Sequence, residues 1–266
     1  MVEAVVPTIF VHLQKTGGST LRLIVRRQYA QGEFIGILQP GREAQLAAYV
    51  ASPEARARVR AIYGHLPFAQ MQALPIEARY ITVLREPIAR VVSHHAFAQR
   101  QPSRGVGAFT QDMTLEQFVV SQPAARMVHN LQTRVLSRLD VEEPVTRATL
   151  DAAKRNLERH FVVVGITERF DEAVLLMRRV LGWPRWPFYE RRNVSPSSVP
   201  TAALPADVIA SIRERNELDI ELYDWAARRF DDVMRASGAR ARAELVAFRA
   251  LNSGHGQRLR RAIRRL

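Results

Sequence analysis

The chain has 266 residues, of which 47% are hydrophobic and 24% charged, a composition typical of a globular protein large enough to bury a full core. It contains no cysteine, which excludes disulfides and thiolate metal sites. Lysines and arginines outnumber acidic residues by 39 to 26, for a net charge of +13, and this excess suits an anionic partner. No nucleic-acid-binding motif accompanies the charge, so we expect no specific nucleic-acid partner.

The positive charge is concentrated at the C-terminus. Residues 235–266 hold nine arginines against one acidic residue, Glu244. We therefore predict a domain over residues 1–237 and a basic, helical tail over residues 238–266. Such a tail suits contact with an anionic membrane or polymer, although a solvated helical end is the commoner arrangement. The sequence shows no signal peptide and no membrane-spanning run, so we expect a cytoplasmic protein.

Continuous apolar runs, separated by helical patterns, predict the fold. The runs have the pattern of central parallel strands that are covered on both faces. In chain order they span residues 5–13, 61–63, 80–84 and 161–166. Helical patterns follow over residues 20–29, 43–59 with a break at Pro53, 87–97, 114–120, 124–139, 147–160, 171–181 and 205–230. This alternation predicts a three-layer α/β fold with a mostly parallel central sheet.

The first apolar run ends in a glycine turn that leads into a helix. Such a turn brings backbone N–H groups and the positive end of a helix dipole to one point, where an anion can bind. Lys15 adds a point charge, and Ser19 and Thr20 add hydroxyl donors. The segment is P-loop-like, but it differs from a Walker A loop because its lysine precedes the glycines instead of following them.

Composition adds weight to Lys15. The chain holds 37 arginines but only two lysines, Lys15 and Lys154. This composition favours a specific role for the lysine at the mouth of the glycine turn, since its compact ammonium differs from the planar fork of arginine. The alternative interpretation is a solvated surface lysine beside a turn.

A second polar group follows the run over residues 80–84. Arg85 ends that run, Pro87 is suited to the first position of a helix, and Ser93 lies eight residues after Arg85. An arginine at a strand end and a hydroxyl on the next helix suit a second phosphate. The alternative is a surface pair of Arg85 with Glu86, in which Ser93 has no role.

Together, the two segments resemble the sulfotransferases that use 3′-phosphoadenosine 5′-phosphosulfate (PAPS), particularly the carbohydrate branch that includes the heparan sulfate O-sulfotransferases. Further matches lie at residues 161–177 and 216–226, so that the resemblance covers most of residues 5–230. It implies that the 5′-phosphosulfate loop consists of Lys15, Thr16, Gly17, Gly18, Ser19 and Thr20. It also implies that Arg85 and Ser93 hold the 3′-phosphate.

A hydroxyl acceptor must lose a proton as it attacks sulfur, and histidine is the commonest side chain for this task. Of the seven histidines, only His65 follows a short predicted strand where a ligand crevice is expected. Its position resembles the Gly-His pair that supplies the base in 6-O-sulfotransferase-like enzymes. We therefore predict His65 as general base and Lys15 as the second catalytic residue, with His95 as the runner-up for the base.

Two further predictions concern the nucleotide. The basic loop with Arg191, Arg192, Asn193 and Ser195 lies where this fold class often closes over its nucleotide, although an ordinary surface loop has the same composition. Thr167 and Glu168 follow the last predicted strand, a position that suits contact with adenine or ribose.

These features predict an O-sulfotransferase that moves a sulfuryl group in line from PAPS to a hydroxyl of a carbohydrate-like acceptor, a glycan or glycolipid. The second product is adenosine 3′,5′-bisphosphate. We expect no metal, because the strand before Arg85 does not end in the aspartate of a Walker B strand. Three alternatives remain: a P-loop nucleotide kinase or other NTPase, a non-catalytic module that binds anionic polymers, and a sulfotransferase whose acceptor is a small metabolite or lipid instead of a glycan.

Overall fold

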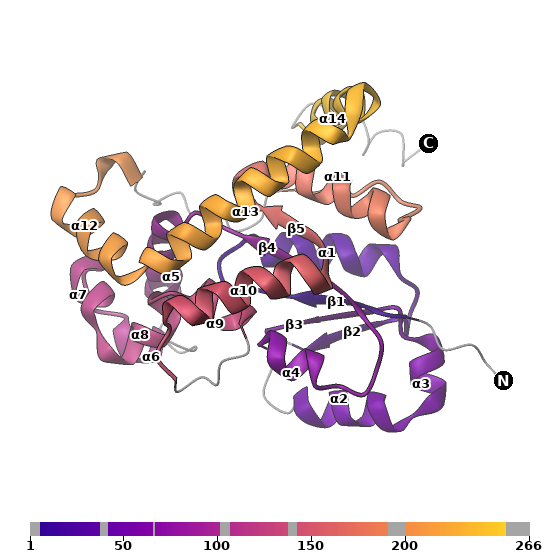
Figure 1. The fold of residues 1–266 in the computed structure, drawn as a ribbon, viewed down its shortest axis with the longest axis horizontal. Coiled ribbons are helices and arrows are strands. Elements are labelled where there is room, and N and C mark those ends of the chain that lie inside the picture. Colours follow the sequence, from indigo (N-terminus) through magenta and orange to yellow (C-terminus); the bar gives the residue numbers. More distant parts are fainter. Residues whose placement is uncertain are drawn as a thin grey trace.

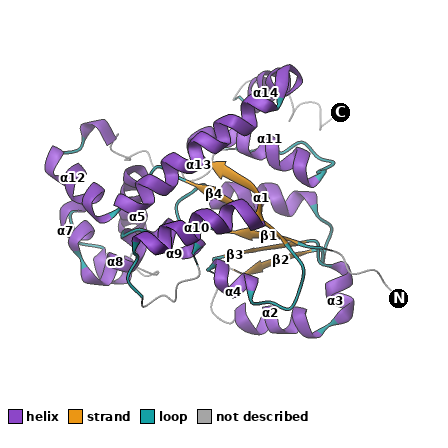
Figure 2. Ribbon diagram, viewed as in Figure 1, coloured by secondary structure: helices purple, strands orange, loops and turns teal. Residues whose placement is uncertain are grey.

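The computed structural model describes residues 6–37, 42–65, 67–101, 107–137, 143–190 and 201–253, apart from a few side chains within them. In this part of the chain, five parallel strands form one sheet at the centre of the molecule (Figure 1 and, in orange, Figure 2). The strands are β1 (Thr8–Val11), β2 (Phe34–Ile37), β3 (Ala61–Gly64), β4 (Arg79–Leu84) and β5 (Phe161–Ile166). Their order across the sheet is β2-β3-β1-β4-β5.

Helices surround this sheet (Figure 1). In chain order they are α1 (Gly18–Gln28), α2 (Arg42–Ala51), α3 (Pro53–Arg58), α4 (Phe68–Gln72), α5 (Pro87–Arg100), α6 (Gly107–Thr110), α7 (Leu115–Val120), α8 (Gln122–Val128), α9 (Leu131–Leu136), α10 (Arg147–His160), α11 (Phe170–Leu181), α12 (Ala206–Arg215), α13 (Glu217–Ala236) and α14 (Gly238–Asn252). None of these described helices is both long enough and apolar enough to span a bilayer.

The sheet is buried on both faces. On one face, Ile9 and Ile62 pack with residues of α2, α4, α10 and α13. On the other, Phe10 and Tyr63 pack with residues of α1, α11 and α14. Successive side chains of a strand point to opposite faces, so a four-residue strand such as β1 contributes to both cores. The predicted three-layer α/β fold is confirmed.

The strand order predicts where a ligand binds. β1 lies between β3 and β4, and the connections run to one side of β1 before they cross to the other. Open parallel sheets bind ligands beyond the carboxyl ends of the strands at such a switch point. The segments that leave β1, β3 and β4 there carry Lys15, His65 and Arg85.

Two predicted helices are interrupted in the structure. The pattern over residues 124–139 divides into α8 and α9, because Asn130 takes a left-handed backbone conformation with φ 44°. The pattern over residues 205–230 divides into α12 and α13 at Asn216, whose buried side chain bonds to the backbone of both Ile212 and Asn130. In each case a polar side chain competes for backbone hydrogen bonds and ends a helix that the apolar pattern alone would continue.

The first half of the basic C-terminal segment forms α14, which packs on the domain. Phe248 of α14 is fully buried. Its ring stacks with Phe188 at a centroid distance of 5.4 Å, and Glu244 pairs with Arg178 and Arg179 of α11. The division of the chain at residue 237 stays a prediction, but this helix shares a core with the sheet.

Candidate active site

The loop after β1 has the backbone geometry of an anion cradle. Lys15 and Gly17 both have left-handed backbone conformations, with φ 69° and 80°. The buried Thr16 hydroxyl donates a hydrogen bond to the Leu13 carbonyl at 2.9 Å and holds the turn together. No side chain caps the N-terminus of α1, so its first N–H groups and dipole are available to an anionic ligand.

The His12 side chain leaves no room for a side chain at position 18, which is therefore glycine. A Cβ at position 18 would lie 1.6 Å from His12 Nε2. The Gly18 carbonyl oxygen in turn accepts a hydrogen bond from the Tyr63 hydroxyl at 2.9 Å. The loop is thus held by two aromatic side chains, His12 directly after β1 and Tyr63 in β3. Of the two remaining loop residues, Ser19 is exposed and Thr20 is buried.

Arg85 lies against this loop. Its Nη1 donates a hydrogen bond to the carbonyl oxygen of Lys15 at 2.9 Å. Burial lowers the pKa of the guanidinium, although the carboxylates of Glu168 and Glu86 oppose the shift. Glu86 does not form a surface ion pair with Arg85: its carboxylate caps α5 by accepting hydrogen bonds from the N–H groups of Ile88 and Ala89.

A cluster of positive charges lies at the mouth of the loop. Lys15 Nζ lies 4.2 Å from the centroid of the Phe97 ring, a cation–π contact. Burial, followed by the charges of Arg100 and Arg85, lowers the pKa of Lys15 to about 8. Ser93, Phe97 and Arg100 have helical spacing and share one face of α5. Like charges held together in this way favour an anionic ligand, which would relieve their repulsion.

His65 follows β3 and lies beside the loop. Its backbone N–H donates to the Ile37 carbonyl at 3.3 Å, and its ring stacks on His12 at a centroid distance of 4.2 Å. Nδ1 lies 3.1 Å from the carbonyl oxygen of His12. A carbonyl only accepts, so the neutral ring carries its proton on Nδ1, and Nε2 is the basic nitrogen.

The other candidate base has a different environment. His95 Nε2 lies 2.8 Å from the Met113 carbonyl oxygen, and its ring contacts Phe118 of α7 at a centroid distance of 5.3 Å. Its neighbour His94 is buried, and burial lowers the pKa of His94 to about 3, helped by the charges of Arg90 and Lys15. His95 therefore contacts α7, whereas His65 contacts the strand that leads into the phosphate loop.

Thr167 and Glu168 already have protein partners. The Thr167 hydroxyl donates to the Leu84 carbonyl at 2.8 Å. The Glu168 carboxylate accepts from the N–H of Glu86 at 3.2 Å and from the Tyr223 hydroxyl at 3.0 Å. Their contact with adenine or ribose stays a prediction. Arg191, Arg192, Asn193 and Ser195 lie outside the described residues.

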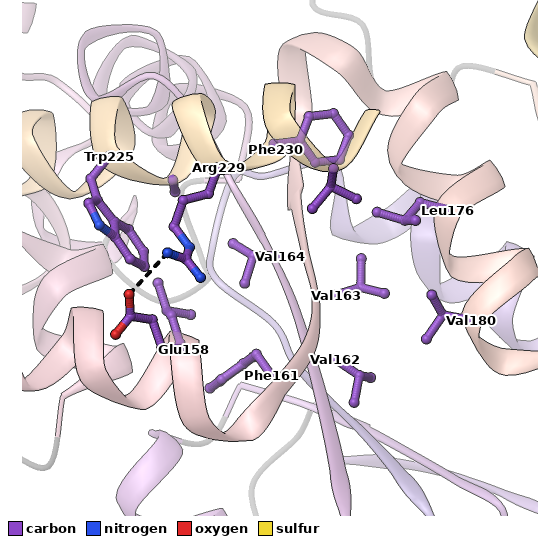
Figure 3. A pocket seen from close by; sticks show the side chains of 13 residues that line it. Glu158, Phe161, Val162, Val163, Val164, Leu176, Val180, Trp225, Arg229 and Phe230 are labelled. Carbon is purple, nitrogen blue, oxygen red and sulfur yellow. Dashed lines mark ion pairs between the residues drawn. The ribbon is translucent and has the colours of Figure 1, made fainter. Parts of the chain in front are cut away.

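A cavity of about 200 Å³ lies elsewhere, over the amino-terminal half of β5 and between α10, α11 and α13 (Figure 3). Its lining is mostly apolar, with Val162 and Val164 on the strand, and an ion pair joins two of its lining residues, Glu158 and Arg229. None of the predicted site residues that the structure describes lines it. Among the described side chains, no group of three or more histidines and carboxylates is arranged to hold a metal, and the absence of a metal requirement stays a prediction.

The sequence reasoning missed three residues that complete this site. His12 supports both Gly18 and His65, Phe97 holds the Lys15 ammonium, and Gln132 bonds to the backbone of Arg85. Phe97 could have been found from its spacing of four residues after Ser93. Gln132 lies 47 residues from Arg85, and no local pattern links the two.

Comparison with known proteins identifies the family of this chain. Residues 3–262 match the family model described as galactose-3-O-sulfotransferase. Galactose-3-O-sulfotransferase 3 of Bos taurus is 30% identical over 234 residues, which are 81% of this chain and 54% of the relative. Heparin sulfate O-sulfotransferase of Drosophila melanogaster is 27% identical over 188 residues, or 64% of this chain and 53% of the relative. Heparan-sulfate 6-O-sulfotransferase 1-A of Danio rerio is 28% identical over 179 residues, or 55% of this chain and 42% of the relative.

The chain thus spans about half the length of the curated relatives it matches. The family match itself covers nearly the whole chain, which confirms the predicted resemblance to carbohydrate sulfotransferases. The chain belongs to the galactose-3-O-sulfotransferase family.

Proposed function

We propose that this protein is an O-sulfotransferase that transfers a sulfuryl group from PAPS to a hydroxyl of a glycan or glycolipid. One observation carries the proposal: the Arg85 guanidinium is bonded to the carbonyl of Lys15. The groups assigned to the 3′-phosphate and to the 5′-phosphosulfate therefore belong to one rigid unit.

The residues present suit this donor. Its 5′ end fits the loop of Lys15–Thr20, where two left-handed residues and an uncapped helix N-terminus offer N–H groups. A side chain at Gly18 would collide with His12, so the loop keeps this conformation only with glycine there. Its 3′-phosphate fits Arg85 and Ser93, and we propose that Arg192 and Asn193 also contact the nucleotide. When bound, PAPS supplies the sulfuryl group.

Lys15 and the loop amides act on the charge that develops during transfer. The ammonium is held against Phe97 and is largely removed from water, where a fixed charge stabilises a developing anion more strongly than in solution. Lys15 thereby stabilises the negative charge that grows on the departing 5′-phosphate oxygen. The loop N–H groups stabilise the charge on the sulfuryl oxygens.

His65 accepts the acceptor's proton at Nε2. The carbonyl of His12 holds the ring by accepting from Nδ1, so the tautomer and the ring orientation are set before the acceptor arrives. The ring becomes cationic when Nε2 takes the proton, while its Nδ1–H keeps the same hydrogen bond. Attack by the deprotonated hydroxyl in line with the departing oxygen then completes the proposed transfer.

The glycan acceptor is supported by relatives that are named for galactose and for heparan sulfate. A nucleotide kinase is less well supported, because β4 ends before Arg85 and not before an aspartate that could hold Mg²⁺. The anionic-polymer module also fits the family match poorly, since that match covers the whole sheet as well as the basic segment.

Thermal unfolding provides the first test. Adenosine 3′,5′-bisphosphate at 100 times its dissociation constant should stabilise the protein by about 2.7 kcal/mol, whereas ATP with Mg²⁺ should have little effect. Transfer of radiolabelled sulfate from PAPS is then screened on galactose-terminated glycans, glycolipids and heparan sulfate. Stabilisation by ATP with Mg²⁺ alone would refute the proposal and favour a nucleotide kinase.

A further inference from the structure

Gln132 forms two hydrogen bonds with the backbone of Arg85. Its Oε1 accepts from the Arg85 N–H and its Nε2 donates to the Arg85 carbonyl, both at 2.9 Å. The Gln132 side chain is fully buried. One side-chain amide thus satisfies both backbone groups of the residue that follows β4, as a neighbouring strand would.

Gln132 is itself held in place by α13. It lies in the first turn of α9, where the N–H groups of Gln132 and Thr133 donate to the Asp219 carboxylate at 3.0 and 2.7 Å. Asp219 is fully buried, and its own N–H donates to Asn130 Oδ1 at 3.0 Å. The carboxylate of one helix therefore caps another helix, with the charge of the buried Arg90 close by.

These contacts form a continuous path to the phosphate loop. Asp219 bonds to the backbone of Gln132, the side chain of Gln132 bonds to the backbone of Arg85, and the side chain of Arg85 bonds to the Lys15 carbonyl. Arg85 lies beyond the last residue of β4, so the sheet ladder does not hold both of its backbone groups. Gln132 supplies that restraint.

We propose that Gln132 is a positioning residue that aims the Arg85 guanidinium at the 3′-phosphate, and that Asp219 fixes Gln132 for this task. The inference rests on the proposed function, because it assumes that Arg85 binds that phosphate. A merely structural role for Gln132 predicts lower stability and an equal effect on every ligand. A positioning role predicts an effect only on ligands with a 3′-phosphate.

The test compares two nucleotides by calorimetry, adenosine 3′,5′-bisphosphate and adenosine 5′-phosphate, with the full chain. Gln132→Leu should lower the affinity for the bisphosphate about tenfold, the scale of one lost hydrogen bond to a charged group. It should leave the affinity for the monophosphate unchanged. Asn156→Leu is the matched control, because Asn156 Nδ2 donates to the Leu136 carbonyl at the other end of α9 and is buried. It should lower stability without any preference between the nucleotides.

The Arg85→Ala background separates the two claims. If Gln132 acts through Arg85, adding Gln132→Leu to the Arg85→Ala variant should not lower the affinity for the bisphosphate any further, because the effects of coupled residues are not additive. Gln132→Glu serves if the leucine variant does not fold, because an ionised carboxylate keeps an acceptor for the Arg85 N–H but cannot donate to its carbonyl. It should cause a smaller loss with the same preference.

Three results would overturn the inference: equal loss for both nucleotides in Gln132→Leu, the same selective loss in Asn156→Leu, or full additivity with Arg85→Ala. If Arg85→Ala lowers the affinity for both nucleotides equally, Arg85 does not bind the 3′-phosphate and the inference about Gln132 fails as well. If Arg85→Ala is selective but neither Gln132 variant is, only the positioning role is refuted.

Discussion

Arg85 Nη1 donates a hydrogen bond to the carbonyl oxygen of Lys15 across 2.9 Å, although the two residues lie 70 positions apart. The bond joins the end of β4 to the loop after β1. Because it uses the backbone of Lys15, the lysine ammonium remains available to a ligand. The two cationic residues are thus linked through a backbone carbonyl, and both positive charges remain available to an anion.

Arg85→Ala should make the binding free energy of adenosine 3′,5′-bisphosphate less favourable by about 2–4 kcal/mol, the range for loss of a desolvated charge partner. Adenosine 5′-phosphate should bind almost as before, because it lacks the group that Arg85 is proposed to hold. Calorimetry with both nucleotides measures the difference. Arg79→Ala, at the exposed opposite end of β4, is the control and should leave both affinities unchanged. Equal loss for the two ligands would contradict the assignment.

Lys15 should act mainly in the transition state. Lys15→Ala and Lys15→Arg should both reduce kcat far more than they reduce nucleotide affinity, because a guanidinium cannot reproduce the compact geometry of the ammonium over Phe97. Single-turnover transfer and equilibrium binding, measured on the same preparations, separate the two effects. An active Lys15→Arg enzyme would show that any positive charge is sufficient.

Nucleotide affinity should depend on pH through Lys15. Its pKa is about 8 in the protein without nucleotide, and a bound phosphate should raise that pKa. Affinity for adenosine 3′,5′-bisphosphate should therefore be level from pH 7 to about 8 and then fall by up to about tenfold per pH unit, as binding takes up a proton. The phosphates do not contribute, since their second ionisation lies near pH 6.

Calorimetry in two buffers with different ionisation enthalpies measures this proton uptake directly. Lys15→Met removes the titrating group, so its affinity should be lower at pH 7 and level up to about pH 9.5. The same slope in wild type and Lys15→Met would assign the titration to another group.

His65→Ala should retain nucleotide binding and thermal stability but lose at least about 10²-fold in sulfuryl transfer, the usual scale for a general base. The comparison requires an acceptor identified in the glycan screen and radiolabelled PAPS. His95→Ala is the control, because His95 bonds to the Met113 carbonyl beside α7, and it should transfer at nearly the wild-type rate. The opposite pattern would place the base at His95.

The sequence predicted the parts of the fold that depend on local patterns. All four predicted strands, the helix over residues 147–160 and the glycine turn follow from apolar runs and helical periodicity, and the structure contains them. β2 was missed because Phe34–Ile37 is short, includes a glycine and is only partly buried. Its identity as a strand comes from pairing with β3, which is a long-range contact.

The residues of the candidate site also divide into those that local sequence patterns predict and those that depend on long-range contacts. The positions of Lys15, His65 and Arg85 were predictable because each follows a strand, and parallel strands end at a common edge. The supporting contacts were not. Asn130 ends one helix and Asn216 another because they bond to each other's segments across 86 residues, and apolar periodicity carries no information about such polar pairs.

The contact between His12 and Gly18 limits how this sequence can vary. Any side chain at position 18 would occupy the space of the His12 imidazole, and that imidazole is also the surface on which His65 stacks. A change at position 18 therefore demands a smaller residue at position 12, and a smaller residue there removes the support of His65. Positions 12 and 18 can therefore change only together, and such a change would also affect the position of His65, the residue proposed as the base.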